Sequence, residues 1–420
     1  MCYNDYKLKY KERIFIMGVL DRFINYIKID SPSDPKSGVT PSSEIQYNVA
    51  NFLVEELKEM GLENIHIKDG TVYAYLPATE GYEDKTAIGF VSHMDTAPEF
   101  NGFGVKPQII ENYDGGDVLL AGSGHVLSPK EFPFLADLKG QKLITTDGTS
   151  LLGADDKAGI AEIMTAVRTV IDEKIPHGKI CVAFTPDEEI GHGVDLFDVE
   201  DFGAKLAYTV DGGAWNTIAY ENFNAVSAVV EFYGYSIHPG SAKGKLKNSQ
   251  YMAFEFNNLL PVAEKPEYTD GFEGFFHLIE TIGSTEKTTL EYILRDHDAD
   301  KIEAKQETMR CIAQFINDKY GEGSCVLKLE EQYRNMKEAV LPYYEVVTYA
   351  ENAIKALGGN PISEAIRGGT DGARLSYMGL PCPNLGTGDM NAHGRYECVT
   401  EDEMIKCTNV VIEIIKQVAL

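Results

Sequence analysis

Three short runs of the chain are apolar at almost every position, and they constrain the fold more than any other feature. They are Thr86–Ser92, Lys179–Thr185 and Leu206–Val210. A strand that is apolar on both sides is expected where both faces of its sheet are covered. Between the first two runs, apolar residues recur at helical spacing from about Asp156 to Ile171. Strands that alternate with helices predict an open, mainly parallel α/β sheet.

The order of elements changes after Phe223. The pattern predicts strands and helices in the order β-α-β-β-α-β, which is the ferredoxin-like, split βαβ arrangement of a small two-layer domain. The predicted elements are a strand at 225–235, a helix at 247–260, strands at 275–283 and 287–295, a helix at 299–319 and a strand at 324–332. After Arg334 the alternation of the first part returns and continues to a final helix at 401–418.

This pattern predicts two domains, one inserted into the other. Residues 17–221 and 336–420 would form a discontinuous catalytic domain, and residues 222–335 an inserted lid or dimerisation domain. We expect residues 1–16, which precede a second Met at position 17, to be a flexible N-terminal extension. Residues 97–150 are rich in Gly, Pro and Asp, and we interpret them as an excursion over the site.

Charge and cysteine usage exclude several classes of function. The formal net charge of −27 would repel a phosphate backbone and an anionic membrane surface, so we expect neither nucleic acid nor a membrane as partner. No apolar run approaches the roughly 20 residues that span a bilayer, and the first 16 residues do not resemble a secretory signal. The seven cysteines include no C-x-x-C pair. They are typical of reduced thiols in a cytoplasmic protein.

Acidic residues and histidines gather just after the predicted strands or at helix starts. In open α/β sheets, ligands bind outside the carboxyl ends of the strands. Several acids placed there would repel one another unless a cation neutralises them. A His/Asp/Glu set without a thiolate suits zinc, and also cobalt or manganese. The segments are Ser92-His93-Met94-Asp95, Gly153-Ala154-Asp155-Asp156-Lys157, Thr185-Pro186-Asp187-Glu188-Glu189-Ile190-Gly191, Thr209-Val210-Asp211-Gly212-Gly213 and Asn391-Ala392-His393-Gly394.

Each of these segments also has a purely structural interpretation. The Asp155-Asp156 pair could cap a helix, and the Glu188-Glu189 pair could lie in a solvated loop. Asp211 before two glycines is an ordinary turn signal. It is the conjunction of all five segments on the strand ends of one sheet that favours a metal site.

Several longer stretches carry a resemblance to a known family. The chain resembles the M20 metallopeptidases, and the resemblance implies a zinc peptidase that releases the N-terminal residue from tripeptides. The matching stretches are VSHMDTAPEFNG (91–102), LLGADDKAGIAEI (151–163), AFTPDEEIGHG (183–193), YTVDGG (208–213), HPGSAKGK (238–245), RGGTDGARLS (367–376) and NLGTGDMNAHGRYE (384–397).

The resemblance implies a site with two zinc ions per subunit. One zinc would be held by His93, Asp155 and Asp211, and the other by Asp155, Glu189 and His393, so that Asp155 bridges the two. Asp95 would orient His93. Glu188 would be the general base that deprotonates a water shared by the two zincs. The resemblance also implies a cis peptide bond between Asp155 and Asp156.

The same resemblance implies four substrate-binding residues in the inserted domain and beyond it. His238 would stabilise the oxyanion, from its own or the partner subunit, although His-Pro-Gly also makes a good turn. Asn248, Arg295 and Arg367 would hold the carboxylate end of the peptide, a task that suits the arginine fork. For Arg295 an ion pair with one of the neighbouring acids is the alternative. Lid-mediated dimers are common in the wider family, which suggests a homodimer.

Two other functions stay open at this level. One is a different M20-type amidohydrolase, such as a dipeptidase or an acyl-amino-acid deacylase. The other is a non-catalytic metal-binding or scaffold protein on the same fold. The long 97–150 segment and the RGGTDG and NAHGRYE stretches favour the tripeptidase, and the complete set of predicted ligands with a base argues against a scaffold.

Overall fold

The computed structural model describes residues 17–420, so the predicted extension at 1–16 lies outside the described residues. The chain forms two compact units. Unit 1 comprises residues 17–220, 339–364 and 370–420, and unit 2 comprises residues 221–338 and 365–369. The role of lid or dimerisation surface that the sequence assigns to residues 222–335 stays a prediction.

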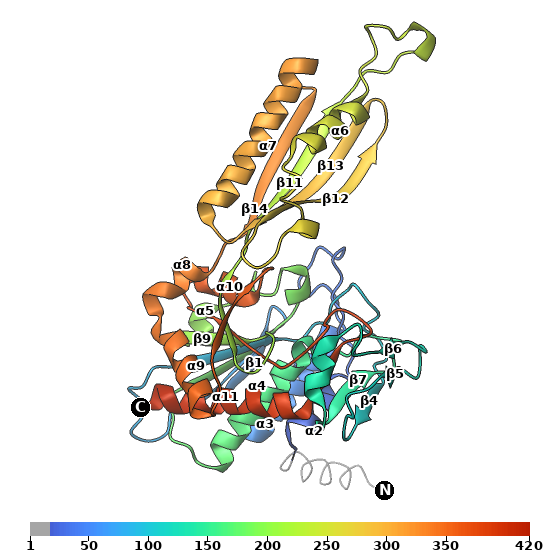
Figure 1. The fold of residues 1–420 in the computed structure, drawn as a ribbon. Coiled ribbons are helices and arrows are strands. Elements are labelled where there is room, and N and C mark those ends of the chain that lie inside the picture. The colour runs from blue at the N-terminus through green and yellow to red at the C-terminus, as the bar shows by residue number, and fades with distance from the viewer. Residues whose placement is uncertain (1–16) are drawn as a thin grey trace. The chain divides into compact units, whose positions relative to one another are not determined.

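Unit 1 is built on an eight-stranded mixed sheet with the strand order β1-β2-β8-β3-β9-β16-β10-β15 (Figure 1). Its central pairs β8–β3, β3–β9 and β9–β16 are parallel, as the sequence predicts. The pairs β1–β2, β2–β8 and β16–β10 beside them are antiparallel. The strands are β1 (Glu63–Lys68), β2 (Thr71–Leu76), β3 (Ile88–His93), β8 (Ile180–Thr185), β9 (Leu206–Val210), β10 (Thr217–Asn222), β15 (Ile362–Ile366) and β16 (Asn384–Leu385).

The three central strands β3, β8 and β9 fall on the three apolar runs and are buried at every position, which confirms that part of the prediction. Helix α4 (Ala154–Asp172) packs against β3 and β9 on one face of the sheet, with α2 (Val19–Tyr26) and α11 (Glu401–Ala419) packed against α4. Helices α5 (Val199–Phe202) and α10 (Asp371–Tyr377) contribute Phe202 and Leu375 to the core of the other face. The remaining helices of this unit are α3 (Gln46–Met60) and α9 (Glu345–Ala356), while α8 (Lys337–Val340) lies at the unit boundary.

The 97–150 segment contains regular secondary structure, and its expected position over the site stays a prediction. It contributes two strands of a three-stranded sheet with the order β17-β7-β4, and a small β5–β6 ladder. These strands are β4 (Pro107–Ile110), β5 (Val118–Leu119), β6 (Val126–Leu127), β7 (Leu143–Thr146) and β17 (Cys398–Thr400). A separate core that includes Tyr113, Leu135 and Cys398 stabilises this sheet, so a C-terminal strand completes a structure that the excursion begins.

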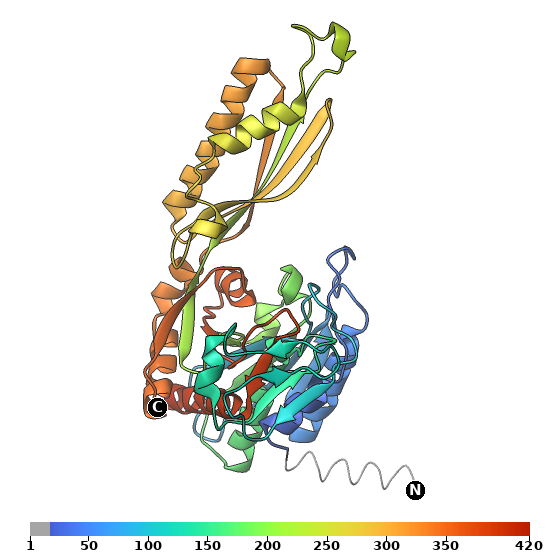
Figure 2. The same ribbon diagram turned by 45° about the vertical axis from the view of Figure 1, so that its right-hand side comes forward.

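Unit 2 has the predicted element order, with an antiparallel sheet of order β12-β13-β11-β14. Its elements are β11 (Asn224–Tyr233), α6 (Ser249–Leu259), β12 (Phe275–Gly283), β13 (Lys287–Asp296), α7 (Ala299–Tyr320) and β14 (Cys325–Tyr333). Alternate residues of β11, such as Val226, Ala228 and Val230, are buried in one core. Helices α6 and α7 cover one face of this sheet (Figure 2).

Among residues 17–420, no helix has both the length and the apolar character that a membrane span requires.

Candidate metal centre

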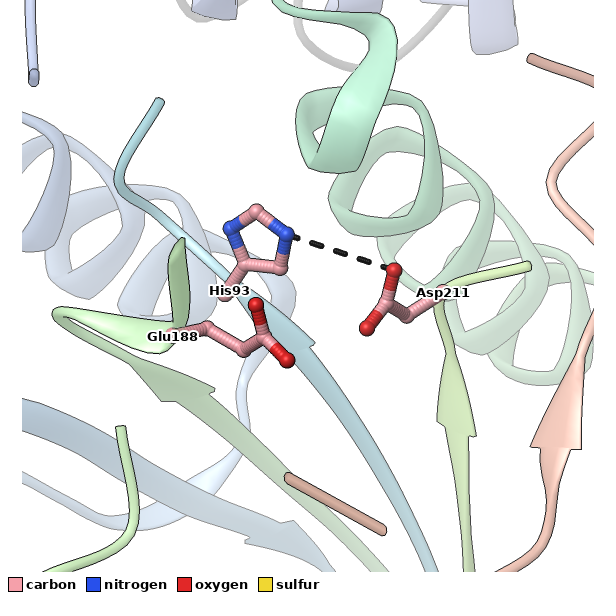
Figure 3. Close-up of side chains that lie close together, drawn as sticks. All are labelled: His93, Glu188 and Asp211. Carbon is pink, nitrogen blue, oxygen red and sulfur yellow. Dashed lines mark ion pairs between the residues drawn. The ribbon is translucent and has the colours of Figure 1, made fainter. Parts of the chain in front are cut away.

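Two predicted ligands and the predicted base come together where three neighbouring strands of unit 1 end. His93 is the last residue of β3, Asp211 follows β9 directly, and Glu188 begins a 3₁₀ turn (Glu188–Ile190) three residues after β8. Because β3 lies between β8 and β9 and all three are parallel, their carboxyl ends meet at one edge of the sheet. Figure 3 shows the three side chains converging, with His93 Nε2 4.0 Å from Asp211 Oδ1.

Two glycines allow Asp155 to join this edge from the start of α4. Gly153 has a φ of +77°, a conformation that L side chains rarely adopt. Gly159 lies so close to β9 that a Cβ there would sit 2.1 Å from the Val210 carbonyl oxygen. The helix therefore begins directly over the strand ends. The peptide bond between Asp155 and Asp156 is cis, as the resemblance implies.

Asp155 lies between two imidazole rings. Its Oδ1 is 2.9 Å from His93 Nε2, and its Oδ2 is 3.2 Å from His393 Nε2. His393 Nε2 is also 3.0 Å from Glu189 Oε2. One carboxylate that presents a different oxygen to each of two histidines has the geometry expected of a bridging ligand.

Asp95 does more than the sequence predicts. The Nδ1 of His93 lies 3.1 Å from the Asp95 carbonyl oxygen and 3.4 Å from its carboxylate. A carbonyl oxygen can only accept, so Nδ1 donates and Nε2 is left to face Asp155. The Asp95 carboxylate also accepts hydrogen bonds from the backbone N–H groups of Glu188 (3.0 Å) and Glu189 (3.2 Å). One buried acid thus holds the histidine and the glutamate turn together.

The cluster carries more negative charge than its histidines neutralise. Burial raises the pKa of Glu189 to about 8, with the Asp155 charge adding to the shift. Burial also raises the pKa of Asp211 to about 6. Burial and the nearby Asp211 charge raise the pKa of Glu188 well above its usual value.

Asp155 is the exception, since hydrogen bonds to His393 and His93 outweigh its burial and lower its pKa. The same contacts raise the pKa of the histidine rings. Hydrogen bonds to Asp155 and Glu189 raise the pKa of His393 to about 11. The two histidines are therefore the positive charges on which the ionised form of Asp155 depends.

The donor set fits divalent metal ions. Oxygen and nitrogen atoms of His93, Glu188 and Asp211 lie within 4.8 Å of one another, and so do those of His93, Asp155 and Glu189. Glu189 Oε1 is buried without a hydrogen-bond partner. Within residues 17–420, the ion pairs of Asp155, Asp211 and Glu189 are with histidine rings and not with Lys or Arg. A cation would supply the missing charge and lower the pKa values that burial raises.

Three buried acids at this site were missed as individual residues by the sequence analysis. Asp156 accepts hydrogen bonds from the His93 N–H (3.1 Å) and from the Ser92 hydroxyl. Asp371 accepts one from the Thr185 hydroxyl (2.8 Å), and burial raises its pKa to about 7. Glu397 accepts three from the turn before Asp155. All three lie inside or beside the quoted stretches, but sequence patterns do not reveal a side chain that binds backbone N–H groups.

The four predicted substrate-binding residues lie in unit 2, and each has a contact within that unit. His238 is exposed and its Nδ1 accepts a hydrogen bond from the Gly240 N–H (3.2 Å). The Asn248 side chain caps α6 by accepting from the Gln250 N–H (3.0 Å). Both residues therefore have a local structural role.

The two predicted arginines pack on aromatic rings. Arg295 is buried over the Tyr333 ring and donates to the Leu294 carbonyl (3.0 Å). The alternative of an ion pair with a neighbouring acid is not what the structure shows, because Asp296 pairs with Lys305 and Asp298 caps α7. Arg367 lies over the Phe223 ring, and its guanidinium donates to the carbonyls of Gly271 and Glu273.

Comparison with known proteins gives a consistent picture. A sequence model of peptidase family M20/M25/M40 matches residues 149–417. Peptidase T of Geobacillus sp. (strain WCH70) is 54% identical over 401 residues, which cover 95% of this chain and 98% of that protein. Several solved structures share the fold. A tripeptidase from Staphylococcus aureus has a TM-score of 0.77 at 22% identity, with 96% of this chain and 98% of that chain covered. A dinuclear metal-binding peptidase of family M20 from Bacillus subtilis has a TM-score of 0.64 at 14% identity, with coverage of 95% and 98%.

Proposed function

Since the chain belongs to peptidase family M20/M25/M40, we propose that it is a metal-dependent aminopeptidase that releases the N-terminal residue from tripeptides. The observation that carries this proposal is Asp155, which presents one carboxylate oxygen to His93 and the other to His393. The extent and identity of the match to peptidase T support tripeptides as the substrate class.

We propose that two zinc ions occupy the centre. His93, Asp155 and Asp211 would hold one ion, and Asp155, Glu189 and His393 the other. The oxygen and nitrogen donors suit zinc, and also cobalt and manganese. When bound, such ions supply Lewis acidity to the nucleophilic water and to the scissile carbonyl.

We propose Glu188 as the general base. No hydrogen bond or ion pair within the described residues engages its carboxylate, whereas the adjacent Glu189 contacts His393. Its burial favours the protonated form, so the carboxylate is a good proton acceptor. In the proposed reaction Glu188 takes a proton from the attacking water and gives one to the leaving amine. Asp95 fixes the turn that carries it.

We propose that Arg295, Arg367 and Asn248 bind the carboxylate end of the peptide and that His238 stabilises the oxyanion. Guanidinium groups bind carboxylates through two parallel hydrogen bonds, which suits a short peptide with a free C-terminus. His238 would act in its own subunit or in that of a partner, and a homodimer is the proposed assembly.

We also propose that the protein works in the cytoplasm. The described cysteines, Cys181, Cys311, Cys325, Cys382, Cys398 and Cys407, are free thiols, as is usual in reducing compartments.

The test of this function is to measure by chromatography whether the free N-terminal residue is released from a tripeptide. The same peptide with an acetylated N-terminus is the matched control. We expect release that a chelator abolishes and added zinc restores, and no release from the acetylated peptide. Zinc-replete, folded protein that cleaves only the acetylated peptide or only dipeptides would contradict the proposal and favour a different amidohydrolase.

A further inference from the structure

Glu397 is a buried acid, and both oxygens of its carboxylate accept hydrogen bonds from backbone N–H groups of another segment. Its side chain is enclosed, with 1% of the residue exposed. Its Oε2 accepts from the N–H groups of Leu152 (2.7 Å) and Gly153 (3.0 Å), and its Oε1 accepts from that of Asp155 (3.1 Å). The three donors belong to the turn that delivers Asp155 to the metal centre.

The backbone of this turn departs from regular helical geometry. It passes through Gly153 in a left-handed conformation, and Asp155 itself lies outside helical φ/ψ values although it belongs to the first turn of α4. Its first N–H groups precede the helical hydrogen-bond ladder and need acceptors from elsewhere. A single carboxyl group binds three of these backbone N–H groups, because each of its two oxygens can accept more than one hydrogen bond.

Glu397 also belongs to the turn that carries the second histidine. His393 and Glu397 lie between Met390 and Cys398, whose backbones pair with each other at 2.9 Å in both directions. Cys398 begins β17, which pairs with β7, the strand that leads into the Asp155 turn. The small sheet formed by the 97–150 segment thus places the two turns side by side, and Glu397 joins them.

We propose that Glu397 is a positioning residue of the metal centre, which sets Asp155 relative to His393 by binding the backbone of the 152–155 turn. The inference rests on the proposed role of Asp155 as a metal ligand. It adds that a residue in the turn of one ligand, His393, holds the turn of another ligand, Asp155. The relative position of these two ligands is therefore fixed.

Glu397→Gln is the direct test, because it changes one acceptor into a donor at nearly constant volume. A glutamine can keep two of the three bonds through its oxygen, but its NH₂ group would then face the Asp155 N–H. We expect zinc affinity, measured with a competing chelator, to fall about 10- to 100-fold. The absorption spectrum of the cobalt-loaded protein should change as well, because the geometry of the ligands changes.

Glu56→Gln is the matched control, and it shows what loss of a buried carboxylate does away from the centre. Glu56 is similarly enclosed, and it accepts hydrogen bonds from Arg22 (2.7 Å) and from the Tyr26 hydroxyl (2.6 Å). This variant should lose thermal stability and keep the wild-type zinc affinity and cobalt spectrum. A purely structural Glu397 would behave in the same way.

The outcomes separate this inference from the proposed function. Reduced zinc affinity in Asp155→Asn together with wild-type affinity in Glu397→Gln overturns the inference alone. Wild-type affinity in Asp155→Asn overturns both. If Glu397→Gln does not fold, Glu397→Asp carries the test, because it keeps the charge and shortens the reach. Wild-type zinc affinity in that variant would overturn the inference.

Discussion

Two predicted functional regions differ in how completely the protein itself neutralises their charges and supplies their hydrogen-bond partners. They are the metal centre of unit 1 and the four predicted substrate-binding residues of unit 2. Among the described residues, the carboxylates of Asp155, Asp211 and Glu189 at this centre pair only with histidine rings, and Glu189 Oε1 has no hydrogen-bond partner. In unit 2, Arg295 and Arg367 rest on aromatic rings and donate to backbone carbonyls. The first region needs an external cation to be electrically balanced, whereas the second is complete without a ligand. Buried carboxylates that lack enough positive partners therefore indicate a binding site more strongly than arginines whose donors already have acceptors.

Removal of the shared ligand should have the largest effect. Asp155→Ala is expected to lose zinc and with it about three orders of magnitude or more in turnover, because the carboxylate faces both histidines. Metal content by mass spectrometry and tripeptide turnover measure the two effects. Asp172→Ala at the other end of the same helix, where Asp172 pairs with Arg168, is the matched control. Full zinc occupancy in Asp155→Ala would contradict the bridging role.

Glu188→Gln should lower turnover without loss of bound zinc. Turnover is expected to fall about 10²- to 10⁴-fold, which is the usual contribution of a general base, while both zinc ions remain bound. Glu189→Gln, one residue away, should instead weaken zinc binding. If Glu188→Gln loses zinc, the residue is a ligand together with His93 and Asp211, as its distance from them allows.

Arg367→Gln tests whether a residue that is satisfied in the free protein also binds substrate. We expect KM for a tripeptide to rise about tenfold, since a hydrogen bond to a charged group contributes roughly 1.5–3 kcal/mol. A tripeptide amidated at its C-terminus should bind wild type and variant equally. Arg310→Gln, in an exposed ion-pair network on α7, is the control. Unchanged KM in Arg367→Gln would limit this arginine to its structural contacts.

The pH dependence of zinc affinity reports the protonation state of His393 in the metal-free protein. Because hydrogen bonds to Asp155 and Glu189 raise the pKa of His393 to about 11, the ring is protonated in the metal-free protein near neutral pH. Zinc must displace that proton, so its affinity should rise with pH by about tenfold per unit for each proton released. Competition with a chelator of known pH behaviour, between about pH 6.5 and 8, measures it. A pH-independent affinity would mean that the histidine is neutral before zinc binds.

Much of the fold could be predicted from the sequence because its signals are local. Continuous apolar runs indicate strands β3, β8 and β9. The 97–150 segment could not be predicted in this way, because its sheet is completed by β17, which lies far later in the chain. Pairing between distant segments leaves no periodic pattern in either.

The site shows the same division. Most of the site residues lie at recognisable strand ends or helix starts, so the topology of the sheet brings them together. These residues are His93, Asp155, Glu188, Glu189 and Asp211. Glu397 could not be predicted, because its partners are backbone N–H groups, which every sequence contains. Asp95 was expected to orient His93, but its bonds to the glutamate turn depend on the register between β3 and the end of β8.

The most direct test of the account is anomalous diffraction at the zinc edge from crystals of the zinc-loaded protein. We predict two peaks on either side of the Asp155 carboxylate, one beside His93 and Asp211 and the other beside Glu189 and His393. A single peak, or two peaks that share a residue other than Asp155, would contradict the central claim that this carboxylate bridges a two-metal site.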